Sequence, residues 1–166
     1  MEIKKLRFKN RVWHCMNQGA IICVCKNADG SYHASYEKNG KSLTCLITGE
    51  DVEILEEKLT ALNIHTWKTE YYEPVCDGET WSIDVTFTNN EEKSIQGSNG
   101  YPENWKEFLY LYYWVAQCCK DAEDGDRQSV NVSRLTNYDI WELDRKFELM
   151  DSETASAMTG TGSELD

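Results

Sequence analysis

The sequence predicts an α+β protein, with an antiparallel sheet (an N-terminal meander plus a later hairpin) packed by two to three helices. Two hairpin signals divide residues 20–47, residues 81–88 alternate between apolar and polar side chains, and residues 49–62 repeat apolar side chains at steps of three and four. Alternation is typical of a strand with one covered face, and the longer step is typical of an amphipathic helix. The length favours one domain, which we expect to span residues 1–150.

The first third of the chain is predicted to be the meander. The turns "NADG" at 27–30 and "NG" at 39–40 separate β-rich runs at about 20–26, 31–38 and 41–47. Asp-Gly and Asn-Gly are strong hairpin signals because both turn positions tolerate positive φ. The earlier segments "IKKLRF" and "RVWHCM" are expected to add one or two strands.

A basic run, "KKLRFKNR", lies within this first segment. We interpret it as the solvated face of a strand, since charge on an exposed strand face is common. Its cations are Lys4, Lys5, Arg7, Lys9 and Arg11.

The segment 48–63 is predicted to be an amphipathic helix. Thr48 is expected to cap it, with Asp51 completing a capping box, and Asn63 is expected to end it. Glutamates fill the side away from the apolar stripe. The stripe consists of Val52, Leu55, Leu59 and Leu62.

A strand pair and a second helix follow. In residues 81–88 the apolar side chains alternate with polar ones, "NNEE" makes a turn, and residues 93–97 return. In "GSNGYPENWKEF", Gly97 and Gly100 are expected to supply unusual backbone angles, and Pro102 to start a helix. The apolar stripe of that helix is Trp105, Phe108, Leu109, Tyr112, Ala116 and Cys119.

A third helix is predicted over 136–150, where apolar residues recur at steps of three and four as a cover for the second helix. The tail 151–166 has no apolar period and is predicted to be disordered and acidic. The stripe of the third helix is Ile140, Leu143, Phe147 and Met150.

Charge is unevenly distributed along the chain. Residues 1–47 carry a net charge of +5 and residues 48–166 a net charge of −17, for a total of −12. A strongly acidic chain is repelled by nucleic-acid phosphates and anionic membranes, so neither direct nucleic-acid nor membrane binding is expected. The absence of a signal peptide and of a long apolar run predicts a cytoplasmic protein with free thiols.

No motif for a catalytic, cofactor or metal site stands out, and none is predicted. The seven cysteines include no C-x-x-C pair, and no phosphate loop is present. A zinc site from His14, Cys15, Cys23 and Cys25 is conceivable across two strands. We favour buried cysteines that act as small apolar residues.

One segment resembles a known family. "DGETWSIDVTFTNNEEKSIQGSNGYPENW", at 77–105, is similar to a pattern in small uncharacterised bacterial proteins, largely from gut Firmicutes. The similarity covers about residues 45–118 and includes a preceding helix, Trp67 and the Gly-Ser-Asn corner before Pro102. No activity is established for that family. The resemblance implies an α+β fold and a bacterial or mobile-element origin.

The leading functional hypothesis is a non-enzymatic protein-binding module. Its concrete form is an acidic inhibitor of a nucleic-acid-handling protein, of the anti-CRISPR or immunity-protein type, whose partner has a basic surface. The alternatives are a cysteine- or metal-dependent hydrolase or nuclease, and a structural module that forms a homodimer through its aromatic helix. The residues expected to contact the partner are Glu53, Glu56, Glu57, Tyr71, Tyr72, Tyr110, Tyr113, Trp114, Asp121, Glu123, Asp124 and Asp126.

Overall fold

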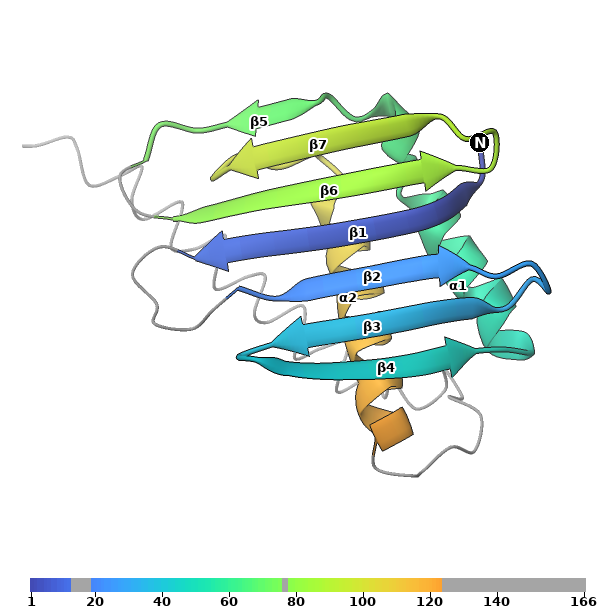
Figure 1. Ribbon diagram of the computed structural model, residues 1–166. Coiled ribbons are helices and arrows are strands. Elements are labelled where there is room, and N and C mark those ends of the chain that lie inside the picture. The colour runs from blue at the N-terminus through green and yellow to red at the C-terminus, as the bar shows by residue number, and fades with distance from the viewer. Residues whose placement is uncertain (13–18, 76–77, 124–166) are drawn as a thin grey trace, which may run out of the picture. The chain divides into compact units, whose positions relative to one another are not determined.

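The computed structural model describes residues 1–12, 19–75 and 78–123, and its elements fall within the first compact unit of the chain. These residues form a seven-stranded sheet in the order β4-β3-β2-β1-β6-β7-β5, with two α-helices on one face (Figure 1). The predicted α+β fold is confirmed. The elements are β1 (Ile3–Val12), β2 (Ile21–Lys26), β3 (Tyr32–Lys38), β4 (Lys41–Ile47), α1 (Glu50–Ala61), a 3₁₀ turn (Ile64–Thr66), β5 (Glu70–Tyr72), β6 (Glu79–Phe87), β7 (Glu92–Ser98) and α2 (Trp105–Glu123).

Strand β1 lies in the middle of the sheet and joins its two halves. It pairs antiparallel with β2 on one side and with β6 on the other. The two predicted N-terminal segments therefore contribute one continuous strand up to Val12, with an irregularity between Ile3 and Lys5. Every pair of neighbouring strands in this sheet is antiparallel except β5 and β7, which are parallel.

The hairpin turns follow the predicted turn chemistry. Asn39 and Gly40 both have positive φ, at 54° and 75°, as a two-residue hairpin turn requires. Gly30 has a φ of 87° in the preceding turn. Asn90, with a φ of 64°, turns the chain between β6 and β7, so the meander and the later hairpin were both predicted correctly.

Helix α1 has the predicted apolar face but a different start. Gly49 occupies the N-cap with a φ of 62°, and no side chain caps the helix, so the capping role expected of Thr48 is wrong. Acidic side chains in the first turn stabilise this end through the helix dipole. Asn63, in the left-handed region at a φ of 48°, follows the helix as expected. The residues buried from this helix and its C-cap are Leu55, Leu59 and Leu62.

The corner between β7 and α2 uses its glycines differently from the prediction. The positive φ belongs to Asn99, at 57°, and to neither glycine. Gly97 is required by close packing instead, because an added Cβ would lie 2.1 Å from Cε2 of Trp81. An added Cβ at Gly100 would lie 2.7 Å from the backbone nitrogen of Tyr72. Pro102 lies three residues before α2 begins, and its carbonyl accepts a 3.0 Å hydrogen bond from the Trp105 amide.

Aromatic rings join α2 to the centre of the sheet. The ring of Phe8 on β1 lies 4.7 Å from that of Phe108 and 5.8 Å from that of Tyr112, measured between centroids. Trp105 packs 4.5 Å from Trp81 of β6. Of the stripe predicted for this helix, Phe108, Ala116 and Cys119 are buried, and Trp105, Leu109 and Tyr112 are half-buried. The helix also buries four residues outside that stripe: Leu111, Trp114, Val115 and Cys118.

The C-terminal predictions concern other parts of the chain. The helix at 136–150, the tail at 151–166 and the domain boundary at residue 150 lie outside the described residues. Over the described ranges, no helix combines the length and the apolar character needed to cross a membrane.

Candidate functional site

The open face of the sheet, opposite the helices, carries a row of cations along its central strand. Leu6 and Phe8 of β1 are buried, and alternate side chains of a strand point to opposite faces. The intervening cations are therefore displayed on the open face, about 6.8 Å apart along the strand. This cationic row consists of Lys5, Arg7, Lys9 and Arg11, all exposed.

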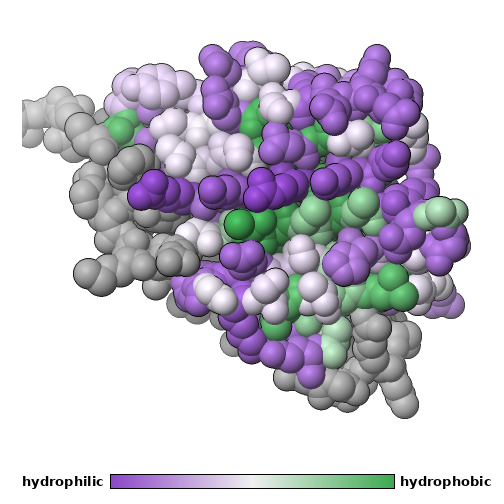
Figure 2. Space-filling model, in the orientation of Figure 1, coloured by the Kyte–Doolittle hydropathy of each residue, from purple (hydrophilic) through white to green (hydrophobic). Residues whose placement is uncertain are grey.

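An apolar band runs beside the cationic row. The register places Cys25 opposite Lys5, Cys23 opposite Arg7 and Ile21 opposite Lys9. Figure 2 shows the hydrophilic row crossing this face with the hydrophobic band next to it. The open face thus carries a basic row on β1 and, directly beside it, an apolar band on β2.

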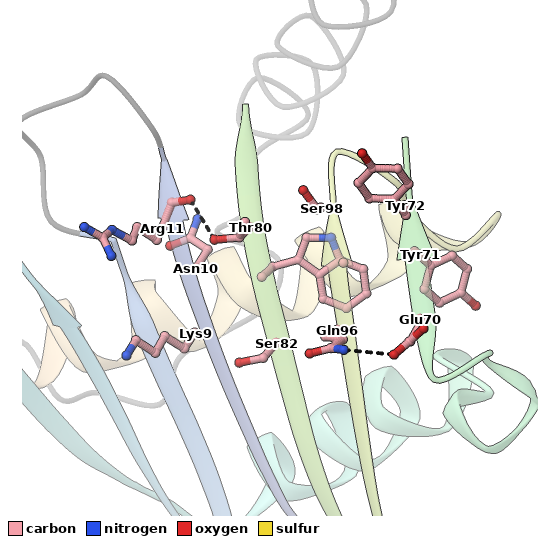
Figure 3. A pocket seen from close by; sticks show the side chains of 12 residues that line it. Lys9, Asn10, Arg11, Glu70, Tyr71, Tyr72, Thr80, Ser82, Gln96 and Ser98 are labelled. Carbon is pink, nitrogen blue, oxygen red and sulfur yellow. Dashed lines mark hydrogen bonds between the residues drawn. The ribbon is translucent and has the colours of Figure 1, made fainter. Parts of the chain in front are cut away.

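One end of the cationic row borders a groove of about 570 Å³ (Figure 3). Its lining comes from four neighbouring strands, β1, β6, β7 and β5, in that order. Register places Lys9 beside Ser82, and Ser82 beside Gln96, which lies beside Glu70. We call this the polar groove, and define it by Lys9, Arg11, Thr80, Ser82, Gln96, Ser98, Glu70 and Tyr72.

The far wall of the polar groove depends on a short strand that the rest of the fold holds in place. Lys93 on β7 donates hydrogen bonds from Nζ to the carbonyls of Ile64, at 3.2 Å, and His65, at 2.9 Å. These contacts fix the segment that leads into β5. The backbone N–H of Gln96 also donates a hydrogen bond to the Thr69 carbonyl, at 2.9 Å. This bond helps to hold β5 in register along the edge of β7.

The polar groove presents hydrogen-bonding side chains and an exposed aromatic ring. Gln96 donates from Nε2 to Oε1 of Glu70, at 3.1 Å, which orients both side chains. Ser82 and Ser98 are half-buried, and their side-chain hydroxyls form no hydrogen bond with a described residue. Tyr72 is 74% exposed at the rim. The groove therefore gathers hydroxyls, an amide, a carboxylate and an exposed aromatic ring from neighbouring strands.

The acidic outer side of α1 is a second surface, on the other side of the molecule. Successive helical residues rotate by about 100°, so Glu50, Glu53 and Glu57 project away from the buried leucines. All three are exposed, and none forms an ion pair with a described residue. Like charges three and four residues apart on a helix repel each other, so this side of α1 favours a cationic neighbour.

Glu56 belongs to the fold and not to this outer side. Its Oε1 accepts hydrogen bonds from Nζ of Lys26, at 2.7 Å, and from the hydroxyl of Tyr32, at 3.2 Å. Lys26 also pairs with Glu2. The Lys26 ammonium holds the pKa of Glu56 below its ordinary value, and burial followed by the Glu56 charge raises the pKa of Tyr32 to about 12. This network ties α1 to β2 and β3.

The network predicts a pH dependence of stability. A depressed pKa means that Glu56 stabilises the folded state above its unfolded pKa of about 4.3 and loses this contribution as the pH falls through the folded pKa. Glu56→Gln is expected to cost at most about 1 kcal/mol at pH 7, because the pair is partly exposed. In urea titrations, the difference between the two proteins should shrink to zero in acid. A difference that is constant with pH would contradict the assignment.

The aromatic residues predicted to contact a partner differ in how far they are exposed. Tyr71 packs 5.9 Å from Trp81, measured between ring centroids, whereas Tyr72 faces the polar groove. On α2, Tyr113 is 38% exposed and Tyr110 is partly exposed, with Lys106 Nζ 5.6 Å from its ring centroid. Trp114 is only 1% exposed, so it contributes to the core and cannot offer its ring to a partner.

The acids predicted at the end of α2 are already engaged where they are described. Asp121 accepts a hydrogen bond from Gln117, at 2.6 Å. Glu123 pairs with Lys41 at 2.8 Å. Asp124 and Asp126 lie outside the described residues. Of the predicted acids, Glu53 and Glu57 thus present the clearest exposed pair.

The described cysteines provide little support for the hydrolase alternative. Burial raises the pKa of Cys23, with Lys5 opposing it, and burial also raises the pKa of Cys118, whereas a nucleophilic cysteine requires a lowered pKa. Cys25 lies opposite His33 in the register, but on an open strand surface. In the described part of the chain, no three His, Cys, Asp or Glu side chains are placed to hold a metal ion. His14 and Cys15 lie outside it.

Sequence reasoning missed the polar groove. The alternation in "KKLRFKNR" marks which cations share a face, and this was read as a solvated strand. The remaining lining residues come from Glu70–Tyr72, Glu79–Phe87 and Glu92–Ser98. In the sequence, these residues appear only as polar positions on the solvent-exposed face of each strand. Such positions indicate a shared groove only when the strand order is known.

No family model matches the chain, and no curated protein matches it. The resemblance of residues 45–118 to small bacterial proteins therefore stays a prediction.

Proposed function

We propose that this protein is a non-enzymatic binding module that engages a basic partner protein through the outer side of its helical layer. The observation that carries the proposal is the alignment of Glu50, Glu53 and Glu57 on α1, which are exposed and form no ion pair with a described residue. The cations of the cationic row lie on the opposite face of the sheet and cannot neutralise them. Charge is thus segregated by face, which favours steered association with a cationic surface.

The finer form of the proposal is inhibition by nucleic-acid mimicry. Glutamates spaced along one side of a helix present a line of negative charge, and Tyr110 and Tyr113 of α2 add ring surface to the same helical layer. Tyrosine is enriched at interfaces because it buries a large area at low entropic cost. A protein that normally holds nucleic acid in a basic groove is the expected partner, as in anti-CRISPR or immunity proteins.

The test compares two charge-reversal variants with equal net charge. Glu50→Lys/Glu53→Lys/Glu57→Lys changes the outer side of α1, and Glu37→Lys/Glu91→Lys/Glu92→Lys changes exposed acids elsewhere. The wild type is expected to retain a basic protein from a bacterial lysate at low salt and to release it at high salt. The α1 variant should lose that protein, while the second variant keeps it.

Two outcomes would count against the proposal. If both variants lose the partner equally, net charge and not the α1 surface determines binding. If the α1 variant retains it, the surface is wrong. Competition with double-stranded DNA tests nucleic-acid mimicry alone, because DNA should displace this protein from its partner. If the partner stays bound to this protein, mimicry is wrong, but the proposal of a protein-binding module still stands.

A further inference from the structure

The structure assigns a covalent modification site to the interface between α2 and β4, where Cys45 and Cys119 form a disulfide when the protein meets a peroxide. Cys45 lies on β4 and Cys119 on α2, 74 residues apart in the chain. Both side chains lie on the helix-covered side of the sheet, whereas Glu50, Glu53 and Glu57 lie on the outer side of α1. The inference is therefore independent of the proposed partner surface.

The distance between the two sulfur atoms carries the inference. Sγ of Cys45 and Sγ of Cys119 are 3.5 Å apart, and both side chains are reduced thiols. A disulfide bond is about 2.05 Å long, so the two sulfurs need to approach each other by about 1.5 Å. Small rotations about the Cα–Cβ bonds of the two residues, with a slight shift of β4 toward α2, supply that movement.

The fold holds the two thiols in contact. Cys45 is 6% exposed and Cys119 is 0% exposed, so both sulfurs lie in packed surroundings. Leu43, Cys45 and Ile47 are the buried residues of β4, and α2 packs across this strand (Figure 1). Because a close-packed interior keeps side chains beside the same neighbours, the two sulfurs remain within reach of each other. A reaction between them is then intramolecular, with a high effective concentration.

The adjacent Cys118 is not the expected partner of Cys45. Successive helical residues rotate by about 100°, so Cys118 and Cys119 point in different directions from α2, and Cys119 makes the 3.5 Å contact. Burial, followed by the nearby Cys45, raises the pKa of Cys118, which makes it a weak nucleophile at neutral pH. Cys118 is therefore a matched control within the same helix.

The reaction has two steps, and hydrogen peroxide is the oxidant. Cys45, the more exposed of the pair, is expected to react first. Its thiolate attacks one peroxide oxygen, an S–O bond forms, the O–O bond breaks, and the released hydroxide takes up the thiol proton as water. The sulfur of Cys119 then attacks the sulfur of Cys45, an S–S bond forms, the S–O bond breaks, and the hydroxide leaves with the Cys119 proton as a second water. Two thiols lose two electrons in total, and one peroxide is reduced to two waters.

The bond would connect the last strand in the sheet order to the helix that covers it. It closes a loop of 74 residues, and a cross-link over a long loop restricts the unfolded chain more than one over a short loop. The urea concentration at the midpoint of unfolding is expected to rise by about 1 M or more on oxidation. The stability of the sheet and its covering helix would thus depend on the redox conditions.

The experiment oxidises the whole folded protein with hydrogen peroxide and blocks the remaining thiols with N-ethylmaleimide. Digestion with trypsin and mass spectrometry, both without reductant, then identify linked peptides. We expect peptide 42–58, which contains Cys45, to be joined to peptide 107–120, which contains Cys118 and Cys119. A reductant should separate the two peptides and return the urea midpoint of the protein to its starting value.

Two variants at adjacent positions locate the bond within the second peptide. Cys119→Ala should abolish both the linked peptide and the rise in the urea midpoint on oxidation. Cys118→Ala removes a buried thiol from the same helix and should keep both. Urea unfolding of the reduced variants, followed by tryptophan fluorescence, establishes that each is folded, and the linked peptide of the wild type tests the inference without any substitution.

The inference is overturned if peroxide leaves the two peptides unlinked, whether the thiols stay reduced or become sulfenic or sulfinic acids. A link that persists in Cys119→Ala, or that forms only after urea has unfolded the protein, would also overturn it. So would a linked protein that unfolds at a lower urea concentration, because the fold would then not accommodate the bond. The α1 charge-reversal variant is expected to form the same disulfide, so failure here and failure of the proposed function can be distinguished.

Discussion

Replacing Phe8 with alanine is expected to lower the free energy of unfolding by about 3–5 kcal/mol. Phe8 is 2% exposed, and its ring contacts those of Trp105, Phe108 and Tyr112 of α2. Removing it takes apolar surface from the core and leaves a cavity between the central strand and the helix. The strand is paired on both sides, so the backbone cannot collapse into the space.

The control for this prediction is the preceding residue of the same strand. Arg7 points to the open face, and Arg7→Thr keeps a residue that favours strands, so its effect should stay within about 0.5 kcal/mol. Urea unfolding followed by tryptophan fluorescence measures both variants. Similar losses for Phe8→Ala and Arg7→Thr would mean that the two faces of β1 are not distinguished as described.

Local periodicity was sufficient to predict the elements and the faces of the fold. The alternation in β6 identified its buried side, and the helical step identified the leucines that α1 buries, because both periods are properties of the backbone itself. The turn at Asn39 and Gly40 was predictable for the same reason, since few residues accept its backbone angles. Each of these features is decided by residues close together in the sequence.

The candidate site depends on pairings that local patterns do not contain. Lys9 and Gln96 line one groove only because β6 lies between β1 and β7. β5 has three residues, too few to show a period. The ion pair between Glu56 and Lys26 could not be predicted from local patterns either, because the packing of α1 beside β2 brings the two residues together. The sequence determined which side chains are polar, and the strand order determined which of them meet.

The second large effect is expected at Gly97, where Gly97→Ala should cost about 1–3 kcal/mol, toward the upper end of that range. The new Cβ would lie 2.1 Å from Cε2 of Trp81. Trp81 cannot easily move away, because it is 3% exposed, donates from Nε1 to the Gly100 carbonyl at 3.0 Å, and packs 4.5 Å from Trp105. Without the clash, the same change would stabilise the protein by about 0.4–1 kcal/mol through the unfolded chain.

A double-mutant cycle separates these two effects. Trp81→Leu removes the ring atoms that the new methyl group would meet, so in that background Gly97→Ala should be neutral or stabilising. The coupling between the two sites, measured by urea unfolding of all four proteins, is then expected to be about 2 kcal/mol or more. A cost of Gly97→Ala that is equal in both backgrounds would show that backbone conformation, and not the Trp81 ring, requires glycine. That result would favour the explanation that the sequence alone suggested, in which Gly97 supplies an unusual backbone angle.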